Sequence, residues 1–231
     1  MSSERLIQET YARLLAAYGP QHWWPADTGF EMMVGAVLTQ ACSWVNVEKA
    51  IAALKAADVL DPASILTITQ GELAALIRPT GYYNAKARKL KALAQFLATN
   101  FDGDPANMAA VPTGQLREML LGVHGVGEET ADDILLYVAG KPVFVIDAYT
   151  RRLAGRLGLA DDRASYGDLS AKFAEAISRE TPSSRRVKIM GEYHALIVRH
   201  AKEACRKVPL CGSCVLRDLC PTGLAARSVP G

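Results

Sequence analysis

Apolar residues recur at helical spacing along almost the whole chain. In the first segment Leu6, Leu14 and Tyr18 share one face, and the stretches 30–38 and 47–54 have the same period. Further segments of this kind lie at about 70–77, 84–99, 113–121, 128–139, 147–157, 165–178 and 185–204, with proline and glycine breakers between them. The pattern therefore predicts about ten short helices and an all-α fold.

One segment does not follow the helical period. Pro142-Val143-Phe144-Val145-Ile146 is apolar at consecutive positions, which is typical of a buried strand. The chain offers no second strand-like run to pair with it. We therefore expect an extended linker there rather than a sheet.

Length and composition are those of an ordinary folded protein. The 231 residues suffice for one large or two small domains, and 50% apolar with 22% charged residues excludes a disordered chain. No apolar stretch approaches the roughly 20 residues that cross a bilayer, so we expect no membrane association. The N-terminus Met1-Ser2-Ser3-Glu4-Arg5 lacks the pattern of an export signal, and we expect a cytoplasmic protein.

Charge is distributed unevenly, although the net charge is only +2. From Thr181 onward, nine lysines and arginines accompany three acidic residues. A second basic cluster consists of Arg78, Lys86, Arg88, Lys89 and Lys91. This distribution is compatible with a nucleic-acid-binding face, and equally with an ordinary solvated helix surface.

Four of the five cysteines lie within sixteen residues near the C-terminus. They are Cys205, Cys211, Cys214 and Cys220, with the spacing C-x5-C-x2-C-x5-C. In a cytoplasmic protein this density indicates metal binding rather than disulfides, and four thiolates suit either zinc or an iron–sulfur cluster. Such a site would hold Arg206 and Lys207 in its first loop as rigid positive charges for phosphate contact. The fifth cysteine, Cys42, is predicted to be in the core.

A glycine-rich turn connects two predicted helices at residues 121–131. Gly125 and Gly127 allow the chain to turn sharply and present backbone amides at the start of the next helix, where an anion such as a DNA phosphate can bind. Taken alone, this turn could equally be an ordinary connection between two helices.

Several motifs together resemble the endonuclease III branch of the helix-hairpin-helix (HhH-GPD) DNA glycosylases. They are Gly125-Val126-Gly127-x-x-Thr130-Ala131, Val145-Ile146-Asp147-Ala148-Tyr149-Thr150-Arg151-Arg152, and the four-cysteine loop. The stretches from Phe30 to Gln40 and from Gly81 to Ala87 resemble two further landmarks of the family, so the match extends from about Trp24 to Pro221. The first cysteine loop has five residues where the family usually has six.

The resemblance implies a two-lobed, all-α enzyme of base excision repair that acts on double-stranded DNA containing a damaged base, generally as a monomer, in association with the nucleoid. Residues 25–134 would form a helical barrel lobe with the hairpin, and residues 1–24 and 135–231 a second lobe with the cysteine loop. The cysteines would hold a [4Fe-4S] cluster. The hairpin residues Gly125, Val126, Gly127 and Thr130 would grip the phosphate backbone. Asp147 would be the catalytic carboxylate, at a groove between the lobes.

One departure from the family pattern concerns the chemistry. Bifunctional members carry a nucleophilic lysine in the hairpin, where this chain has Glu129. A carboxylate cannot form the Schiff base with the sugar that leads to strand cleavage, so the resemblance implies a monofunctional glycosylase without β-lyase activity. Asp147 would then stabilise the cationic sugar or activate the attacking water, and its position also suits a helix N-cap. Glu129 would lie near the mouth of the base pocket, although the first turn of a helix also favours an acidic residue.

The damaged base is indicated by the tryptophans, which all lie within 22 positions. Trp23, Trp24 and Trp44 could form the walls of a pocket for a flipped base, with an added cation–π attraction for an alkylated purine, or could pack the first helix against the body. Together with Leu38-Thr39-Gln40 they resemble the endonuclease III-like glycosylases that excise 3-methyladenine. Gln40 could enter the gap left by the flipped base, or could be a surface residue.

Two alternatives to an alkylated purine stay open. One is a glycosylase for uracil, mismatched or oxidised bases, although these neutral bases need more specific hydrogen bonding. The other is a non-catalytic protein that binds damaged DNA, which the presence of Asp147 disfavours.

Overall fold

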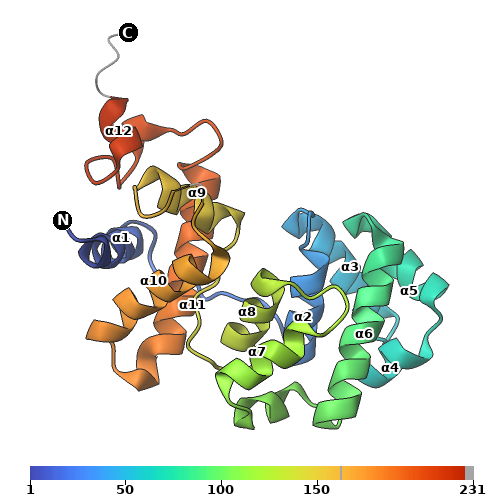
Figure 1. Cartoon of the computed structure of the whole chain (residues 1–231). Helices are drawn as coiled ribbons and strands as arrows, with labels where there is room; N and C mark the ends of the chain where they lie inside the picture. Colours follow the sequence, from blue (N-terminus) through green and yellow to red (C-terminus); the bar gives the residue numbers. More distant parts are fainter. Residues whose placement is uncertain (162, 227–231) are drawn as a thin grey trace. The chain divides into compact units, whose positions relative to one another are not determined.

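The computed structural model describes residues 1–161 and 163–226, which form two compact helical units (Figure 1). One unit combines Met1–Trp23 with the chain from Pro142 onward, and the other is Trp24–Lys141. No strand occurs in the described residues, as the all-α prediction requires. The predicted boundary at residue 134 lies inside helix α8 (Glu128–Tyr137). The unit continues to Lys141, because the amide of Lys141 bonds back to the carbonyl of Leu135 at 2.8 Å.

Helix α2 (Gly29–Leu38) is the centre of the Trp24–Lys141 unit. Every residue from Phe30 to Leu38 is buried, as expected of a helix that is apolar all round. Around it are α3 (Trp44–Ala56), α4 (Pro62–Thr67), α5 (Gln70–Leu76), η1 (Arg78–Thr80), α6 (Tyr83–Phe101), η2 (Pro105–Ala110), α7 (Thr113–Leu121) and α8. Helices α3, α6 and α8 contact α2 directly and bury its faces.

Helix α11 (Ser183–Glu203) is the centre of the other unit and packs against α1, α9 and α10. The remaining elements are α1 (Ser3–Tyr18), α9 (Ala148–Arg156), α10 (Tyr166–Glu180), η3 (Cys211–Ser213) and α12 (Pro221–Ala225). Phe144 stacks on Phe173 at a centroid distance of 4.7 Å and meets the ring of Tyr193 edge-on at 5.5 Å. The segment 142–146 is indeed extended and unpaired, and Phe144 anchors it in this core.

One sequence-based prediction about an individual residue is wrong. Cys42 is not in the core: it lies half-buried in the short loop between α2 and α3. The basic cluster on α6 is not a continuous surface, because two of its lysines turn inward. Lys86 is buried and donates to the carbonyls of Leu38 and Thr80 at 2.9 and 2.8 Å. Lys91 donates to the carbonyls of three residues at the end of α4, namely Ile65, Leu66 and Ile68.

The inward lysines have a common physical reason. The last carbonyls of a helix lack partners within the helix, and an ammonium group satisfies them while it meets the negative end of the helix dipole. None of the described helices is both long enough and apolar enough to cross a membrane.

Candidate active site

Asp147 begins helix α9 as its N-cap. Its Oδ1 accepts a hydrogen bond from the backbone amide of Thr150 at 2.6 Å. Burial acts to raise the pKa of Asp147, but His194 and the bonds from Thr150 outweigh it, so the pKa lies below its usual value. The carboxylate is therefore ionised at neutral pH and held in one orientation.

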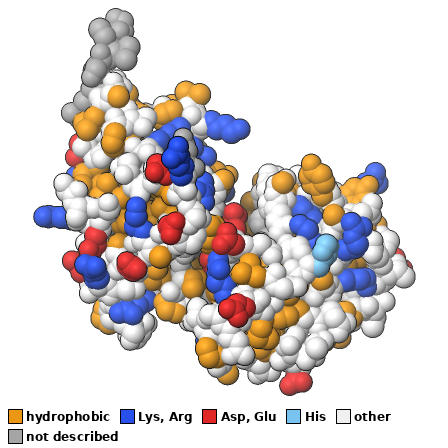
Figure 2. All heavy atoms as spheres, in the orientation of Figure 1, with side chains coloured by type: hydrophobic (Ala, Val, Ile, Leu, Met, Phe, Trp, Pro, Cys, Tyr) orange, Lys and Arg blue, Asp and Glu red, His pale blue; other side chains and the backbone are white. Residues whose placement is uncertain are grey.

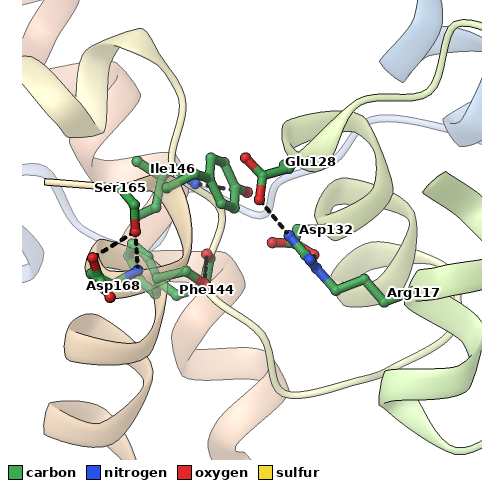
Figure 3. Close-up of polar contacts among 9 residues, drawn as sticks. Arg117, Glu128, Asp132, Phe144, Ile146, Ser165 and Asp168 are labelled. Carbon is green, nitrogen blue, oxygen red and sulfur yellow. Dashed lines mark hydrogen bonds and ion pairs between the residues drawn. The ribbon is translucent and has the colours of Figure 1, made fainter.

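The extended segment before Asp147 is fixed by helix α10 (Figure 3). The amide of Ile146 donates to the hydroxyl of Tyr166 at 3.3 Å, and the hydroxyl of Ser170 donates to the carbonyl of Phe144 at 2.7 Å. Helix α10 itself is capped by Ser165, which bonds to both the amide and the carboxylate of Asp168. These hydrogen bonds restrict the conformation of the backbone that leads to the Asp147 carboxylate.

The hairpin consists of α7, the turn 122–127 and α8. Gly125 has a φ of +86°, and a Cβ there would lie 2.3 Å from Cγ of Lys89, so only glycine fits this turn without displacing the lysine. Arg117 braces the two helices: its Nε is 2.8 Å from the carboxylate of Asp132, and its Nη2 is 3.4 Å from that of Glu128 (Figure 3). The turn therefore presents its backbone in a defined conformation.

Gln40 is hydrogen-bonded to this hairpin. Its Nε2 donates to the carbonyl of Gly125 at 3.1 Å and to the hydroxyl of Thr130 at 3.0 Å. Its Oε1 accepts from the ammonium of Lys89. The structure thus brings Gln40, Gly125 and Thr130 together. To insert into a DNA duplex, the side chain of Gln40 would have to break these hydrogen bonds.

The four clustered cysteines line one small apolar cavity between α9, α11 and the C-terminal loop. No group of three His, Cys, Asp or Glu side chains among the described residues is gathered closely enough for a single metal ion. A tetrahedral zinc with Zn–S bonds of ~2.3 Å needs sulfurs under about 4 Å apart, whereas a cubane cluster binds each thiolate at a separate iron. Four thiols around a shared cavity are the donor set of a metal centre with thiolate ligands.

Side chains from two helices, α9 and α11, reach these sulfurs. Arg156 of α9 donates to Sγ of Cys205 at 3.1 Å and to the carbonyls of Arg206 and Lys207 at 2.7 and 2.8 Å. Arg156 therefore holds the backbone of the cysteine loop at Arg206 and Lys207, whose side chains are exposed. Arg156 could not have been assigned this position from sequence spacing.

His200 is a second residue that the sequence reasoning missed. Its Nε2 lies 3.6 Å from Sγ of Cys214, and its Nδ1 lies 2.9 Å from the hydroxyl of Tyr18 in α1. Burial lowers the pKa of His200 to about 4 and raises that of Tyr18, so the imidazole is neutral and the phenol keeps its proton. The phenol then donates to Nδ1, which leaves the Nε2 proton directed at the sulfur.

A family model for the HhH-GPD superfamily of base excision DNA repair proteins matches residues 34–179, a range that includes the hairpin and Asp147. The chain belongs to this family. Both the predicted family and the predicted fold class are therefore confirmed.

Three similar proteins illustrate the relationship. A Methanocaldococcus jannaschii protein that its name assigns to the DNA repair glycosylases, MJ1434, is 44% identical over 217 residues, or 93% of this chain and 96% of the relative. Endonuclease III of Treponema pallidum is 31% identical over 221 residues, which cover 93% and 92% of the two chains. The crystal structure of H. pylori 3-methyladenine DNA glycosylase (MagIII) bound to 1,N6-ethenoadenine matches with 29% identity and a TM-score of 0.74, over 88% of this chain and 98% of that one.

Within this HhH-GPD glycosylase, two of the three tryptophans meet. The rings of Trp24 and Trp44 stand edge to face at 5.6 Å, and both line a pocket of about 230 Å³ on the Trp24–Lys141 unit. Gly35 lies against the indole of Trp24, because a Cβ there would be in ordinary contact with Nε1 at 3.4 Å. The carboxylates of Glu31 and Glu48 also lie in the wall.

Trp23 and Glu129 are not among the described residues that line this pocket. Trp23 belongs to the other unit, where the ammonium of Lys202 lies 6.0 Å from its ring centroid. Glu129 is in the first turn of α8, beside Glu128. The structure thus separates the predicted base-pocket residues into a pair that meets and two that lie elsewhere.

An exposed basic surface covers part of the Trp24–Lys141 unit. Figure 2 shows lysine and arginine side chains gathered around a histidine on this unit. Arg78, Arg88 and His124 are among the exposed residues of this unit. Tyr82, at the start of α6, is 77% exposed and has a left-handed φ of 46°, which a bulky residue rarely adopts. Tyr82 lies in the stretch from Gly81 to Ala87 that resembles a family landmark but was not predicted as a site residue, although an aromatic residue directly after Gly81 was a signal.

Proposed function

We propose that this protein is a monofunctional DNA glycosylase that hydrolyses the N-glycosidic bond of an alkylated purine, such as 3-methyladenine. The observation that carries the proposal is which residues occupy two positions of the family pattern, that of the catalytic carboxylate and that of the nucleophilic lysine. Asp147 is an ionised and anchored carboxylate, whereas the hairpin position of the nucleophilic lysine is occupied by Glu129. Only water is then left as the nucleophile.

In the proposed reaction, Asp147 is the group of this chain that acts on the sugar. As the C1′–N bond of the damaged nucleoside breaks, its electron pair neutralises the positive ring of the base. The charge that develops on the sugar is stabilised by the Asp147 carboxylate, which is the main role expected of a preorganised anion. The oxygen of a water molecule bonds to C1′, and the surplus proton passes to Asp147 or to solvent. The products are the free base and an intact abasic site.

The pocket lined by Trp24 and Trp44 supports the choice of base. At about 230 Å³ it is smaller than the usual drug-binding cavity and suits one flipped base. Its walls are aromatic and carry the carboxylates of Glu31 and Glu48, while Lys55 forms an ion pair with Glu31 at 2.8 Å. Aromatic faces and surplus negative charge favour a cationic base over a neutral one.

The DNA duplex would be held through its backbone. The hairpin amides at Gly125 and Gly127 would bind phosphate on either side of Val126, whose own amide donates to the carbonyl of Val123 at 3.0 Å. The side chains of Arg206 and Lys207 would add charge contacts. Gln40 and the exposed ring of Tyr82 are the candidates to enter the stack beside the flipped nucleotide. One protein molecule would act on each lesion, at the nucleoid.

The cysteine loop would hold a [4Fe-4S] cluster through Cys205, Cys211, Cys214 and Cys220. Bound there, the cluster would supply a rigid cross-link and a redox-active centre. Arg156 and His200 would donate to its thiolates, and Arg156 would keep the loop backbone under Arg206 and Lys207 in place.

A substrate panel tests the proposed function. Purified protein is incubated with alkylated, uracil, mismatch and oxidised-base duplexes, with and without later alkaline cleavage. We expect strand breaks only after alkali and only in the alkylated duplex. Breaks without alkali would contradict monofunctionality, and excision confined to another duplex would identify the alternative substrate. Damage-dependent binding without excision of any base would indicate a non-catalytic protein.

The role of the pocket is tested by Trp44→Ala, with the exposed neighbour Val45→Ala as the matched control. We expect Trp44→Ala to slow excision about tenfold or more, because one stacking face is worth ~1–3 kcal/mol. Val45→Ala should excise at the wild-type rate. Equal rates in all three proteins would remove the pocket from the proposal.

A further inference from the structure

A buried histidine lies beside the carboxylate of Asp147. Nε2 of His194 is 3.7 Å from Oδ2, and the two side chains are only 5% and 13% exposed. His194 comes from α11, whereas Asp147 caps α9. The pair is therefore formed by the packing of two helices and not by sequence proximity.

The two carboxylate oxygens have different partners. Oδ1 is bonded to the amide of Thr150, and Oδ2 is the oxygen directed toward His194. A distance of 3.7 Å exceeds that of a hydrogen bond but is within ion-pair range. A small rotation of the imidazole would bring the two groups to bonding distance.

The burial of the His194 imidazole among apolar residues costs free energy. Every residue from Tyr193 to Val198 is buried, and the others in this run are apolar apart from the phenol of Tyr193. A polar ring at such a position is expensive unless it interacts with another polar or charged group. An ionised carboxylate that is itself mostly buried needs the same compensation, so each group offsets the cost of the other.

We propose that His194 is a positioning residue for Asp147: it fixes the direction of Oδ2 and keeps the carboxylate ionised during base excision. The inference rests on the proposed catalytic role of Asp147. His194 acts through the carboxylate and needs no contact with the DNA.

Titratable groups on α9 and α10 have hydrogen-bond partners of their own. On α9, Arg151 donates to the carbonyl of Ala164, and Arg152 donates to the carbonyls of Cys205 and Ala201. From α10, the hydroxyl of Tyr166 accepts from the amide of Ile146. On α11, His194 acts to lower the pKa of Asp147.

The test compares His194→Leu, His194→Gln and the control Tyr193→Phe. The control removes a buried hydrogen bond from the adjacent residue of α11 to the carbonyl of Ile7, without touching Asp147. Single-turnover excision from the alkylated duplex is measured across pH, with the protein-free duplex as background. Affinity is measured on a duplex with a stable abasic analogue.

We expect His194→Leu to lower the rate about tenfold or more while affinity changes less than about twofold. Its acid limb should move to higher pH, because loss of the partner raises the pKa of Asp147 and the carboxylate is protonated earlier. His194→Gln should recover part of the rate, since an amide can still donate, but not the position of the acid limb. Tyr193→Phe should leave the acid limb unchanged.

The outcomes separate the inference from the function on which it rests. A wild-type rate and acid limb in His194→Leu would overturn the positioning role. If His194→Leu does not fold, an unshifted acid limb in His194→Gln would overturn it in the same way. Full excision by Asp147→Asn would instead refute the proposed function itself, whatever the histidine variants do.

Discussion

At the scale of single residues, Asp147 serves both the fold and the chemistry. The oxygen that caps α9 is fixed by the amide of Thr150, and this bond directs the rest of the carboxylate. A good N-cap is therefore compatible with a catalytic anion, because the cap uses only one of the two oxygens.

Asp147→Asn separates these two roles. Asparagine is also a good N-cap, so α9 should persist, while the loss of the negative charge should lower the excision rate by roughly 10²–10⁴. Single-turnover kinetics on the alkylated duplex measure the rate. Asp61→Asn makes the same exchange at the N-cap of α4 and should change nothing. Equal excision rates in Asp147→Asn and Asp61→Asn would show that catalysis does not need the Asp147 carboxylate.

The same substitution changes the pH dependence of stability. The folded-state pKa of Asp147 is lowered, so its charge stabilises the native protein above the unfolded-state pKa, and this contribution is lost as pH falls through the folded value. The difference in free energy of unfolding between wild type and Asp147→Asn should therefore shrink toward acid pH. Urea unfolding at several pH values measures it. A difference that grows toward acid pH would contradict the lowered pKa.

Lys86 shows that a lysine in a family motif can be structural. We expect Lys86→Met to lower the free energy of unfolding by about 2–4 kcal/mol, since the carbonyls of Leu38 and Thr80 lose their donor inside the protein. Urea unfolding measures the change. Lys49→Met removes an exposed lysine from α3 and should have little effect. Similar values for both variants would mean that the buried ammonium contributes no net stability.

At the scale of elements, the hairpin depends on contacts from outside itself. Arg117 joins α7 to α8, and Lys89 of α6 lies against the turn at Gly125. Gln40, from the end of α2, completes the support through its bond to the carbonyl of Gly125. The sequence motif therefore describes the turn, but Lys89 of α6 and Gln40 in the loop after α2 also determine how rigidly it is held.

Gly125→Ala tests this element. The added Cβ meets Lys89, and alanine is strained at a φ of +86°, so we expect a loss of about 1–2 kcal/mol in stability. Displacement of the turn should also weaken binding to undamaged duplex DNA about tenfold, as measured by fluorescence anisotropy. Gly114→Ala is the control, because nothing lies within 4 Å of its Cβ. Unchanged DNA affinity in Gly125→Ala would argue against phosphate binding by the turn.

At the scale of the whole molecule, the cysteine loop connects segments that are far apart in sequence. Arg156 of α9 and His200 of α11 reach its sulfurs, and Tyr18 of α1 reaches His200. Whatever occupies the cavity is therefore linked to the N-terminal helix as well as to the C-terminal chain.

Removal of one cysteine should affect the whole unit. We expect Cys211→Ala to lose iron and the broad absorption of an iron–sulfur protein, and to lower Tm by on the order of 10 °C, because metal binding contributes folding free energy. Cys42→Ala is the matched control, since Cys42 lies in the loop between α2 and α3, and it should keep both properties. Zinc in the wild-type protein would refute the cluster.

The sequence by itself determined the helical architecture, the family and the local chemistry of each motif. Helical periodicity, the glycines of the hairpin and the spacing of the cysteines act over short distances along the chain, so they can be read without coordinates. The N-cap role of Asp147 and the first-turn position of Glu129 belong to this group.

Only the tertiary structure decided which distant side chains meet. Helix packing brings His194 to Asp147, Arg156 and His200 to the cysteines, and Trp24 to Trp44, while it turns Lys86 inward and places Trp23 in a different unit from Trp24. The physical reason is that burial and electrostatic partnership depend on the rotation and crossing of whole helices, which the periodicity of one helix cannot specify.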